Sequence, residues 1–259
     1  MLLSIYKRMI NNLAMKLTYN NVTIEFFDSV PDQILLSLSG GLDSASLFYV
    51  VSRYLPQIKV IPFTCKDLSA PVDAILARDI VSWMQDEFPK NNIQNLEEYE
   101  FDHNDPYWVK IAENQWETLK VPNNGKRVGR AGKITGLAKI FQKEAIESKL
   151  IKKYSNALVC TGTTCNPPID EQKKYGFYHI AERRRDPPPS HPKRITDRSY
   201  HPFNDVDKKF VAEIYKKHNL MNSLYLLTNS CIGSAKVTEN FTKECKECFW
   251  CYEKEWAFK

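Results

Sequence analysis

The hexapeptide Ser39-Gly40-Gly41-Leu42-Asp43-Ser44 lies between an apolar run and a helical pattern. Residues 34–38 read as a buried strand, and residues 45–54 carry apolar side chains at helical spacing. Two glycines allow a tight turn and a close approach of the backbone to a ligand. The start of the next helix presents free N–H groups and the positive end of its dipole, and both favour an anion. We call residues 38–44 the glycine loop and predict that it binds phosphate.

The glycine loop is not of the Walker type, because no Gly-Lys-Ser/Thr follows it. The alternative interpretation is an Asp or Ser helix cap after a glycine turn. The hydroxyls of Ser39 and Ser44 add donors for an anion, and a carboxylate at Asp43 is suited to magnesium, which bridges phosphates through one or two carboxylates.

The rest of the chain alternates strand and helix patterns. A length of 259 residues with 43% hydrophobic and 26% charged residues fits one large α/β domain with a small appendage, and we predict the boundary between domains 1–220 and 221–259. The order β-α-β-α-β-α-β predicts a doubly wound parallel sheet, whose ligands lie beyond the carboxyl ends of the strands. Strands are expected over 16–27, 60–64, 96–101 and 157–162, and helices over 75–88, 108–119 and 141–154.

Two basic segments, 120–136 and 182–198, lack regular patterns. They are predicted to be either lids over an anionic substrate or plain surface loops. The net charge of +5 suits an anion such as ATP and does not require nucleic acid. Because no apolar run reaches membrane-spanning length and the first residues do not read as a secretory signal, we expect a cytoplasmic protein without a membrane partner.

The seven cysteines include a cluster with the spacing of metal ligands. Cys245, Cys248 and Cys251 form C-x2-C-x2-C, and Cys231 lies upstream. Four thiolates complete a tetrahedral zinc site, although C-x2-C-x2-C also occurs in iron–sulfur proteins. A chance cluster of core thiols is the third interpretation. Of the remaining cysteines, Cys165 follows the strand at 157–162 and is a candidate catalytic thiol.

The glycine loop resembles the pyrophosphate loop of ATP pyrophosphatases such as asparagine, NAD and GMP synthetases and tRNA thiolases. Together with the cysteine spacing, it resembles the 7-cyano-7-deazaguanine synthase family. That likeness continues in Thr161–Thr164, in His201–Lys208, in Asn229–Cys231 and in the final segment Tyr252–Phe258. It is good over roughly 30–65 and 155–259 and poor over 90–155.

The departures from the family fall at the acceptor end. Val121–Gly125 stands where the family has a proline-x-Arg-Asn motif, and Cys165–Glu171 replaces its Tyr-Pro-Asp-Cys segment. The chain is therefore predicted to be a divergent synthase, or a paralogue that acts on another carboxylate, including one on a protein or nucleic acid.

The resemblance implies an ATP-dependent ligase that converts 7-carboxy-7-deazaguanine and ammonia to 7-cyano-7-deazaguanine through an acyl adenylate, releasing AMP and pyrophosphate. It implies ATP, Mg²⁺ and Zn²⁺ as cofactors, ammonia that is free or supplied by a partner, and a homodimer. One rival is a thiolase or amidase of the same loop type acting on tRNA or a protein terminus. The other is a binding module with a vestigial nucleotide site and a zinc ribbon that contacts nucleic acid.

The site residues implied by this reading fall into four groups. Asp43, Ser44 and Lys208 are the predicted catalytic residues, with Lys209 as the neighbouring alternative. An aromatic slot for a planar acceptor is expected among Tyr175, Phe177 and Tyr178. The predicted nucleotide contacts are Leu38, Ser39, Gly40, Gly41, Leu42, Asp43, Ser44 and Gly162, and the predicted zinc ligands are Cys231, Cys245, Cys248 and Cys251.

Overall fold

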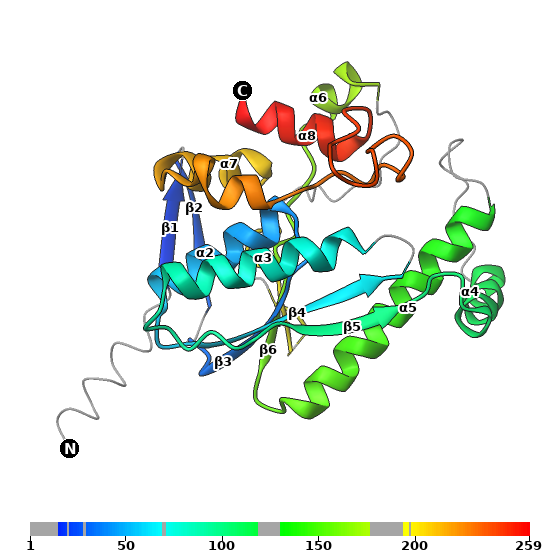
Figure 1. Cartoon of the computed structure of the whole chain (residues 1–259), viewed down its shortest axis with the longest axis horizontal. Coiled ribbons are helices and arrows are strands. Elements are labelled where there is room, and N and C mark those ends of the chain that lie inside the picture. Colours follow the sequence, from blue (N-terminus) through cyan, green and yellow to red (C-terminus); the bar gives the residue numbers. More distant parts are fainter. Residues whose placement is uncertain are drawn as a thin grey trace.

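A twisted sheet of six strands runs through the centre of the molecule (Figure 1). The computed structural model describes residues 15–19, 21–27, 30–68, 71–118, 130–176, 194–196 and 198–259. The strand order is β5-β4-β3-β6-β8-β7, in which all neighbours pair in parallel except β7 and β8. The strands are β3 (Gln33–Ser37), β4 (Lys59–Asp67), β5 (Glu97–Phe101), β6 (Leu158–Cys160), β7 (Arg194–Thr196) and β8 (Ser199–Tyr200).

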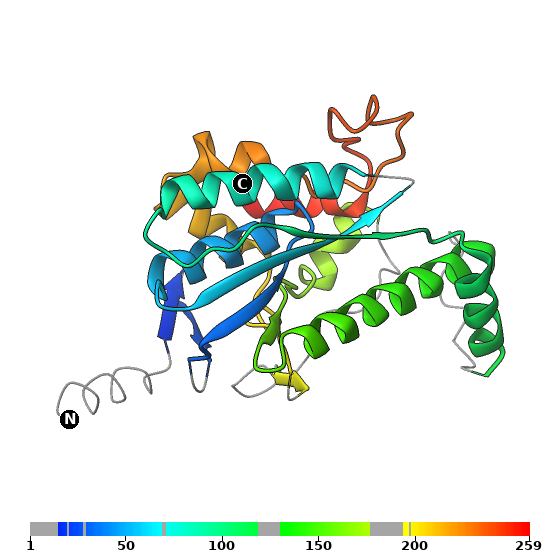
Figure 2. The same ribbon diagram turned by 60° about the horizontal axis from the view of Figure 1, so that its bottom comes forward.

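Helices cover both faces of the sheet, which confirms the predicted doubly wound α/β architecture (Figures 1 and 2). One face carries α2 (Leu42–Tyr54), α3 (Val72–Glu87) and α7 (Lys208–Lys217). The other carries α5 (Arg130–Lys153), against which α4 (Pro106–Thr118) packs. Successive residues of β3 serve the two cores in turn, since Ile34 and Leu36 face the first and Leu35 faces the second. The apolar runs of the sequence reflect this burial on both sides.

The direction of winding reverses between β3 and β6. The chain places β4 and β5 on one side of β3, and β6 and β8 on the other. Connections leaving two such strands diverge, and the crevice between them is where open α/β sheets bind ligands. The glycine loop follows β3, and Thr161 and Gly162 follow β6, so both lie at this point.

The remaining elements pack around the face that holds α7. The hairpin of β1 (Met15–Tyr19) and β2 (Val22–Phe26) reaches it through Tyr19, whose ring lies edge-on to Phe210 at 5.1 Å between centroids. The helix α8 (Phe249–Phe258) also packs on α7, and the predicted boundary between domains 1–220 and 221–259 stays a prediction. Shorter helices are α6 (Ile169–Lys174), η1 (Leu220–Asn222) and η2 (Leu224–Leu227).

Two segments predicted to be irregular are partly regular. Helix α5 already begins at Arg130, because Ile134 and Ala138 pack on Ala112 of α4 and extend the helix. Residues 194–196 form β7 because β8 offers them an antiparallel partner. Residues 119–129 and 177–193 lie outside the described part of the chain. No helix in the described ranges is both long and apolar enough to cross a membrane.

Candidate functional site

The backbone of the glycine loop depends on Gly40. Its φ of +72° lies in the left-handed region, which favours glycine. A Cβ atom at this position would lie 2.8 Å from Cβ of Leu76 and 3.1 Å from the carbonyl oxygen of Asp73. The first turns of α3 therefore press against the loop, and no larger residue fits at Gly40.

The two serines of the loop bond to each other. Ser44 Oγ accepts from the backbone N–H of Ser39 at 3.3 Å and lies 3.3 Å from Ser39 Oγ. The same hydroxyl lies 3.2 Å from the carbonyl oxygen of Gly41, to which it donates. The side chains of Leu38 and Leu42 are buried in the core beneath the loop. The serines thus hold the turn closed, and the leucines anchor it to the sheet and to α2.

Asp43, in the first turn of α2, faces a buried lysine. Lys208 Nζ lies 3.3 Å from Asp43 Oδ2 and 2.9 Å from Glu253 Oε2. The Lys208 side chain is only 1% exposed, and that of Glu253 is fully buried. Burial opposes the charge on Lys208, but the carboxylates of Asp43 and Glu253 outweigh it and raise the pKa of the lysine. The structure therefore brings together two of the predicted catalytic residues, Asp43 and Lys208, with Glu253 as a third member of the group.

The geometry at Asp43 fits a divalent cation. Its Oδ2 receives Lys208 and the hydroxyl of Thr164, the latter at 3.4 Å. Its Oδ1 is buried and has no hydrogen-bond partner among the described residues. With both carboxylates ionised and one lysine charged, the group of three carries one net negative charge. A buried, unbalanced carboxylate oxygen of this kind suits magnesium, directly or through water.

Gly162 is required by the approach of β6 to the glycine loop. A Cβ atom there would lie 2.5 Å from the carbonyl oxygen of Asp43 and 2.7 Å from the backbone nitrogen of Ser44. The absence of a side chain at Gly162 therefore lets two segments of the chain meet at the crevice. A nucleotide contact at Gly162 stays a prediction.

The four clustered cysteines converge on one point. The sulfur atoms of Cys231, Cys245, Cys248 and Cys251 all lie within 4.8 Å of one another. Cys251 Sγ lies 3.5 Å from Cys248 Sγ and 3.9 Å from Cys245 Sγ. Bonds of about 2.3 Å to one tetrahedral ion would separate the sulfurs by about 3.8 Å. In a cubane cluster each thiolate binds a different iron, which requires wider separations, so this arrangement fits a single ion better.

Backbone N–H groups point at the clustered sulfurs. Cys231 Sγ accepts from Gly233 and from Cys245, at 3.3 and 3.2 Å. Cys245 Sγ accepts from Glu247 and from Cys248, at 3.5 and 3.4 Å. Burial alone would raise the pKa of Cys245, but these donors and hydrogen bonds with the thiols of Cys231 and Cys248 lower it to about 7. Such donors stabilise thiolates, the form that binds a metal.

Two segments of the chain connect the cysteine cluster to the region of the glycine loop. Asn229, two residues before Cys231, donates its backbone N–H to the carbonyl oxygen of Gly40 at 2.9 Å. In the other segment, Cys248 and Cys251 fix the start of α8, and the same helix carries Glu253 to Lys208. The cysteine cluster therefore fixes both the segment at Asn229, which bonds to the glycine loop, and the helix whose Glu253 binds Lys208.

The structure also gives positions for other predicted residues. The candidate catalytic thiol, Cys165, is buried. Tyr175 stacks on Tyr252 with centroids 5.1 Å apart. Lys209 lies 4.7 Å from the centre of the Trp256 ring, away from the carboxylates that hold Lys208. Phe177 and Tyr178 lie outside the described residues.

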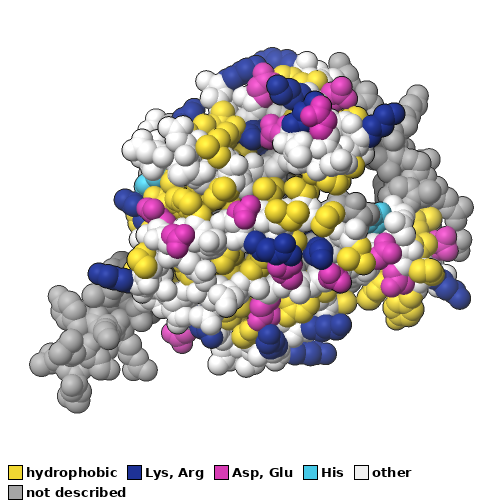
Figure 3. All heavy atoms as spheres, viewed as in Figure 1, with side chains coloured by type: hydrophobic (Ala, Val, Ile, Leu, Met, Phe, Trp, Pro, Cys, Tyr) yellow, Lys and Arg dark blue, Asp and Glu magenta, His cyan; other side chains and the backbone are white. Residues whose placement is uncertain are grey.

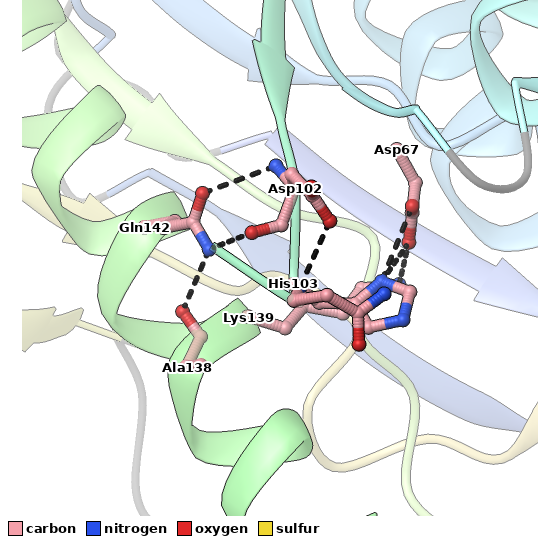
Figure 4. Close-up of polar contacts among 7 residues, drawn as sticks. Asp67, Asp102, His103, Ala138, Lys139 and Gln142 are labelled. Atoms are coloured by element: carbon pink, nitrogen blue, oxygen red, sulfur yellow. Dashed lines mark hydrogen bonds and ion pairs between the residues drawn. The ribbon is translucent and has the colours of Figure 1, made fainter. Parts of the chain in front are cut away.

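Sequence reasoning missed two parts of this region. Glu253 has only a weak signal in the sequence. It is a charged residue in the helix that follows the cysteine motif, and a charged residue is rarely buried unless it has a partner. The second part is a polar cluster around Asp67 and His103, at the carboxyl ends of β4 and β5 (Figure 4). Each of these residues is isolated in the sequence, and only the sheet register brings them together.

No protein-family model and no curated protein match the sequence. Among solved structures, the chain is similar to the glutamine-dependent NAD⁺ synthetase of Acinetobacter baumannii, with 14% identity and a TM-score of 0.41 over 80% of this chain and 34% of that one. The U34-tRNA thiolase NcsA of Methanococcus maripaludis, solved with its [4Fe-4S] cluster, is 13% identical with a TM-score of 0.41, over 88% of this chain and 64% of that one. The NMN synthetase of Francisella tularensis is 14% identical with a TM-score of 0.41, over 88% of this chain and 87% of that one. This chain thus spans about a third of the first protein, and likenesses of this size say nothing by themselves about its reaction.

Proposed function

We propose that the chain is an enzyme that cleaves ATP to AMP and pyrophosphate in order to activate a carboxylate. The observation that supports this most directly is the buried group of Asp43, Lys208 and Glu253 behind a glycine loop at the reversal point of the sheet. A loop that lacks the Walker lysine but has a buried lysine behind its aspartate suits pyrophosphate as the group held.

In this proposal the residues of the loop bind and orient. Backbone N–H groups of residues 39–44 surround the pyrophosphate at the start of α2, where the helix dipole favours an anion. Lys208 fixes the carboxylate of Asp43 and adds positive charge behind the loop. Magnesium, held by Asp43, would supply charge neutralisation for the departing pyrophosphate. Catalysis then comes from positioning and preorganised charge.

For the acceptor we propose 7-carboxy-7-deazaguanine, on the strength of the sequence resemblance. Its carboxylate oxygen attacks the α-phosphorus of ATP, pyrophosphate leaves, and an acyl adenylate forms. Ammonia displaces AMP to give an amide, and a second ATP activates the amide oxygen before dehydration to the nitrile. A different carboxylate, on a small molecule, a protein or a nucleic acid, is the alternative. A homodimer and a cytoplasmic location belong to this proposal.

For the cysteine cluster we propose structural zinc. The sulfur separations favour one ion, and four protein ligands leave no open position for a substrate.

The test is product analysis with ATP, 7-carboxy-7-deazaguanine and ammonium. We expect AMP and pyrophosphate from the wild type and a loss of at least about 100-fold for Asp43→Asn, which keeps the shape but removes the charge. Asp86→Asn, on the exposed side of the last turn of α3, is the matched control and should leave the rate unchanged. ADP as the main product would exclude the proposed reaction.

A further inference from the structure

The turn after β5 places a histidine beside a nearly buried carboxylate at the same edge of the sheet as the glycine loop. His103 Nδ1 lies 3.3 and 3.2 Å from the two carboxylate oxygens of Asp67 (Figure 4). The Asp67 side chain is 9% exposed and that of His103 27%. Because a carboxylate only accepts, the proton of the neutral imidazole lies on Nδ1. The other nitrogen, Nε2, makes no hydrogen bond within the described part of the chain and has a lone pair to offer.

This pair lies close to the glycine loop. Strand β4 pairs with β3 at Ser37 and Phe63 and then continues to Asp67, so its end projects beyond the start of the loop. Helix α3, which follows β4, brings the carbonyl oxygen of Asp73 to 3.1 Å from where a Cβ of Gly40 would be. The Asp73 carboxyl in turn interacts electrostatically with Asp67. One residue of α3 therefore links the two sites.

The pair is not needed to hold the turn that carries it. Gln142 of α5 already clamps that turn, because it accepts from the N–H of Asp102 at 3.2 Å and donates to the Asp102 carbonyl at 2.7 Å. The carboxylate of Asp102 also accepts from the N–H of Asn104 at 2.9 Å. Figure 4 shows the two bonds between Asp102 and Gln142 on the side of the turn away from Asp67. A purely structural histidine would duplicate a connection that is already made.

The other histidines in the described ranges have different surroundings. His201 bonds to the hydroxyl of Ser199, and His218 bonds to Tyr19 at 2.9 Å on the far side of α7. His103 has a carboxylate on one ring nitrogen, and its second nitrogen is open within the described part of the chain. An imidazole that is oriented by a carboxylate in this way is a proton acceptor.

We propose that Asp67 and His103 form the base that takes the proton from the nitrogen nucleophile as it displaces AMP from the activated carboxylate. This inference rests on the function proposed above. The nitrogen lone pair forms the new C–N bond, the bond from carbon to the AMP oxygen breaks, and its electron pair leaves with AMP. The surplus proton on nitrogen passes to Nε2 of His103 and then to water. His103 is the catalytic residue, and Asp67 is the positioning residue that stabilises the imidazolium.

Charged groups from three elements face the pair. Helix α5 contributes Lys139, whose Nζ lies 3.4 Å from Asp67 Oδ2, and Lys143. Helix α3 contributes Asp73, and the turn itself contributes Asp102.

The test separates activation from nitrogen transfer in the full chain. Exchange of labelled pyrophosphate into ATP, with 7-carboxy-7-deazaguanine and no ammonia, measures activation alone. Amide formation with ammonium measures both steps. We expect His103→Gln to keep pyrophosphate exchange within about twofold and to lose about 100-fold or more in amide formation. Asp67→Asn should show the same split to a smaller degree, and His218→Gln, remote from the loop, should show neither loss.

Hydroxylamine provides a readout that a structural role would not change. After its attack on the carbonyl, the nitrogen of hydroxylamine loses the surplus proton to water more readily than that of ammonia does, so hydroxylamine should restore most of the turnover of His103→Gln. Equal losses of exchange and amide formation, or no loss at all, would overturn the inference. Absence of exchange in the wild type would instead reject the proposed function.

Discussion

At the scale of single residues, the charge on Lys208 holds together two carboxylates that would otherwise repel each other. Lys208→Met would leave Asp43 and Glu253 buried without a cation, at a cost of about 3–5 kcal/mol of unfolding free energy. Because the pKa of Lys208 is raised in the folded chain, this contribution is complete below its unfolded pKa of about 10.4 and is lost as the pH rises through the folded value. Urea denaturation should therefore give the same deficit at pH 7 and pH 9. Lys209→Met, next in sequence, should cost under about 1 kcal/mol.

Two glycines make a matched pair at the same scale. Gly162→Ala places a methyl group 2.5 Å from the Asp43 carbonyl, and the contacting atom is backbone, so the loop itself must move. We expect loss of stability by about 2 kcal/mol or more, together with weaker nucleotide binding. Gly136→Ala lies in α5 with nothing within 4 Å and should raise stability by about 0.5–1 kcal/mol. Thermal unfolding with and without ATP compares the two, and similar behaviour would contradict the assigned contact.

Some residues of the site could be predicted from their neighbours in the sequence, and others could not. The glycine loop was predictable because its strand, turn and helix follow one another in the sequence, so a short stretch of residues indicates the local structure. Glu253 was not, because its role depends on how α8 packs on α7. Asp67 and His103 were missed for the same reason, since the register of β4 against β5 pairs Asp67 with Phe101, two positions before the histidine.

At the scale of elements, α8 depends on the cysteine cluster at its first turn. Cys248→Ser, or removal of the metal with a chelator, should release α8 and with it Glu253. We expect faster amide exchange over residues 229–259 and loss of ATP turnover, because a structural zinc site contributes on the order of 10 kcal/mol to local folding. Elemental analysis should find one zinc per chain. Iron with sulfide, or a metal-free chain with normal exchange over this region, would contradict the assignment.

The elements themselves were largely predictable from periodicity, and their ends were not. The pattern over 141–154 gave the packed part of α5, but the helix starts at Arg130, since contacts with α4 extend it. The strand at 194–196 has no periodicity of its own and exists because β8 lies beside it. Tertiary partners therefore decided the boundaries that sequence periodicity left open.

At the scale of the whole molecule, the distribution of charged side chains on the surface bears on whether the acceptor is a small molecule or a nucleic acid. The face in Figure 3 mixes basic and acidic side chains over its described residues and shows no broad patch of one sign. Binding to a nucleic acid requires several phosphate contacts and weakens steeply with salt. We expect turnover with 7-carboxy-7-deazaguanine to change less than about twofold between 50 and 200 mM salt. Turnover that appears only with tRNA or DNA and falls steeply over this range would favour the alternative acceptor.

The link from Asp43 through Lys208 to Glu253 joins positions far apart in the sequence. During synthesis the glycine loop leaves the ribosome long before α8, so an emerging chain has the loop without its distant supports. The residues between them can build much of the sheet, yet Asp43 lacks its lysine until α7 is made, and the lysine lacks its second carboxylate until α8 is in place. The proposed ATP site is therefore completed late in synthesis, and a product truncated before α8 should accumulate as a folded sheet that does not turn over ATP.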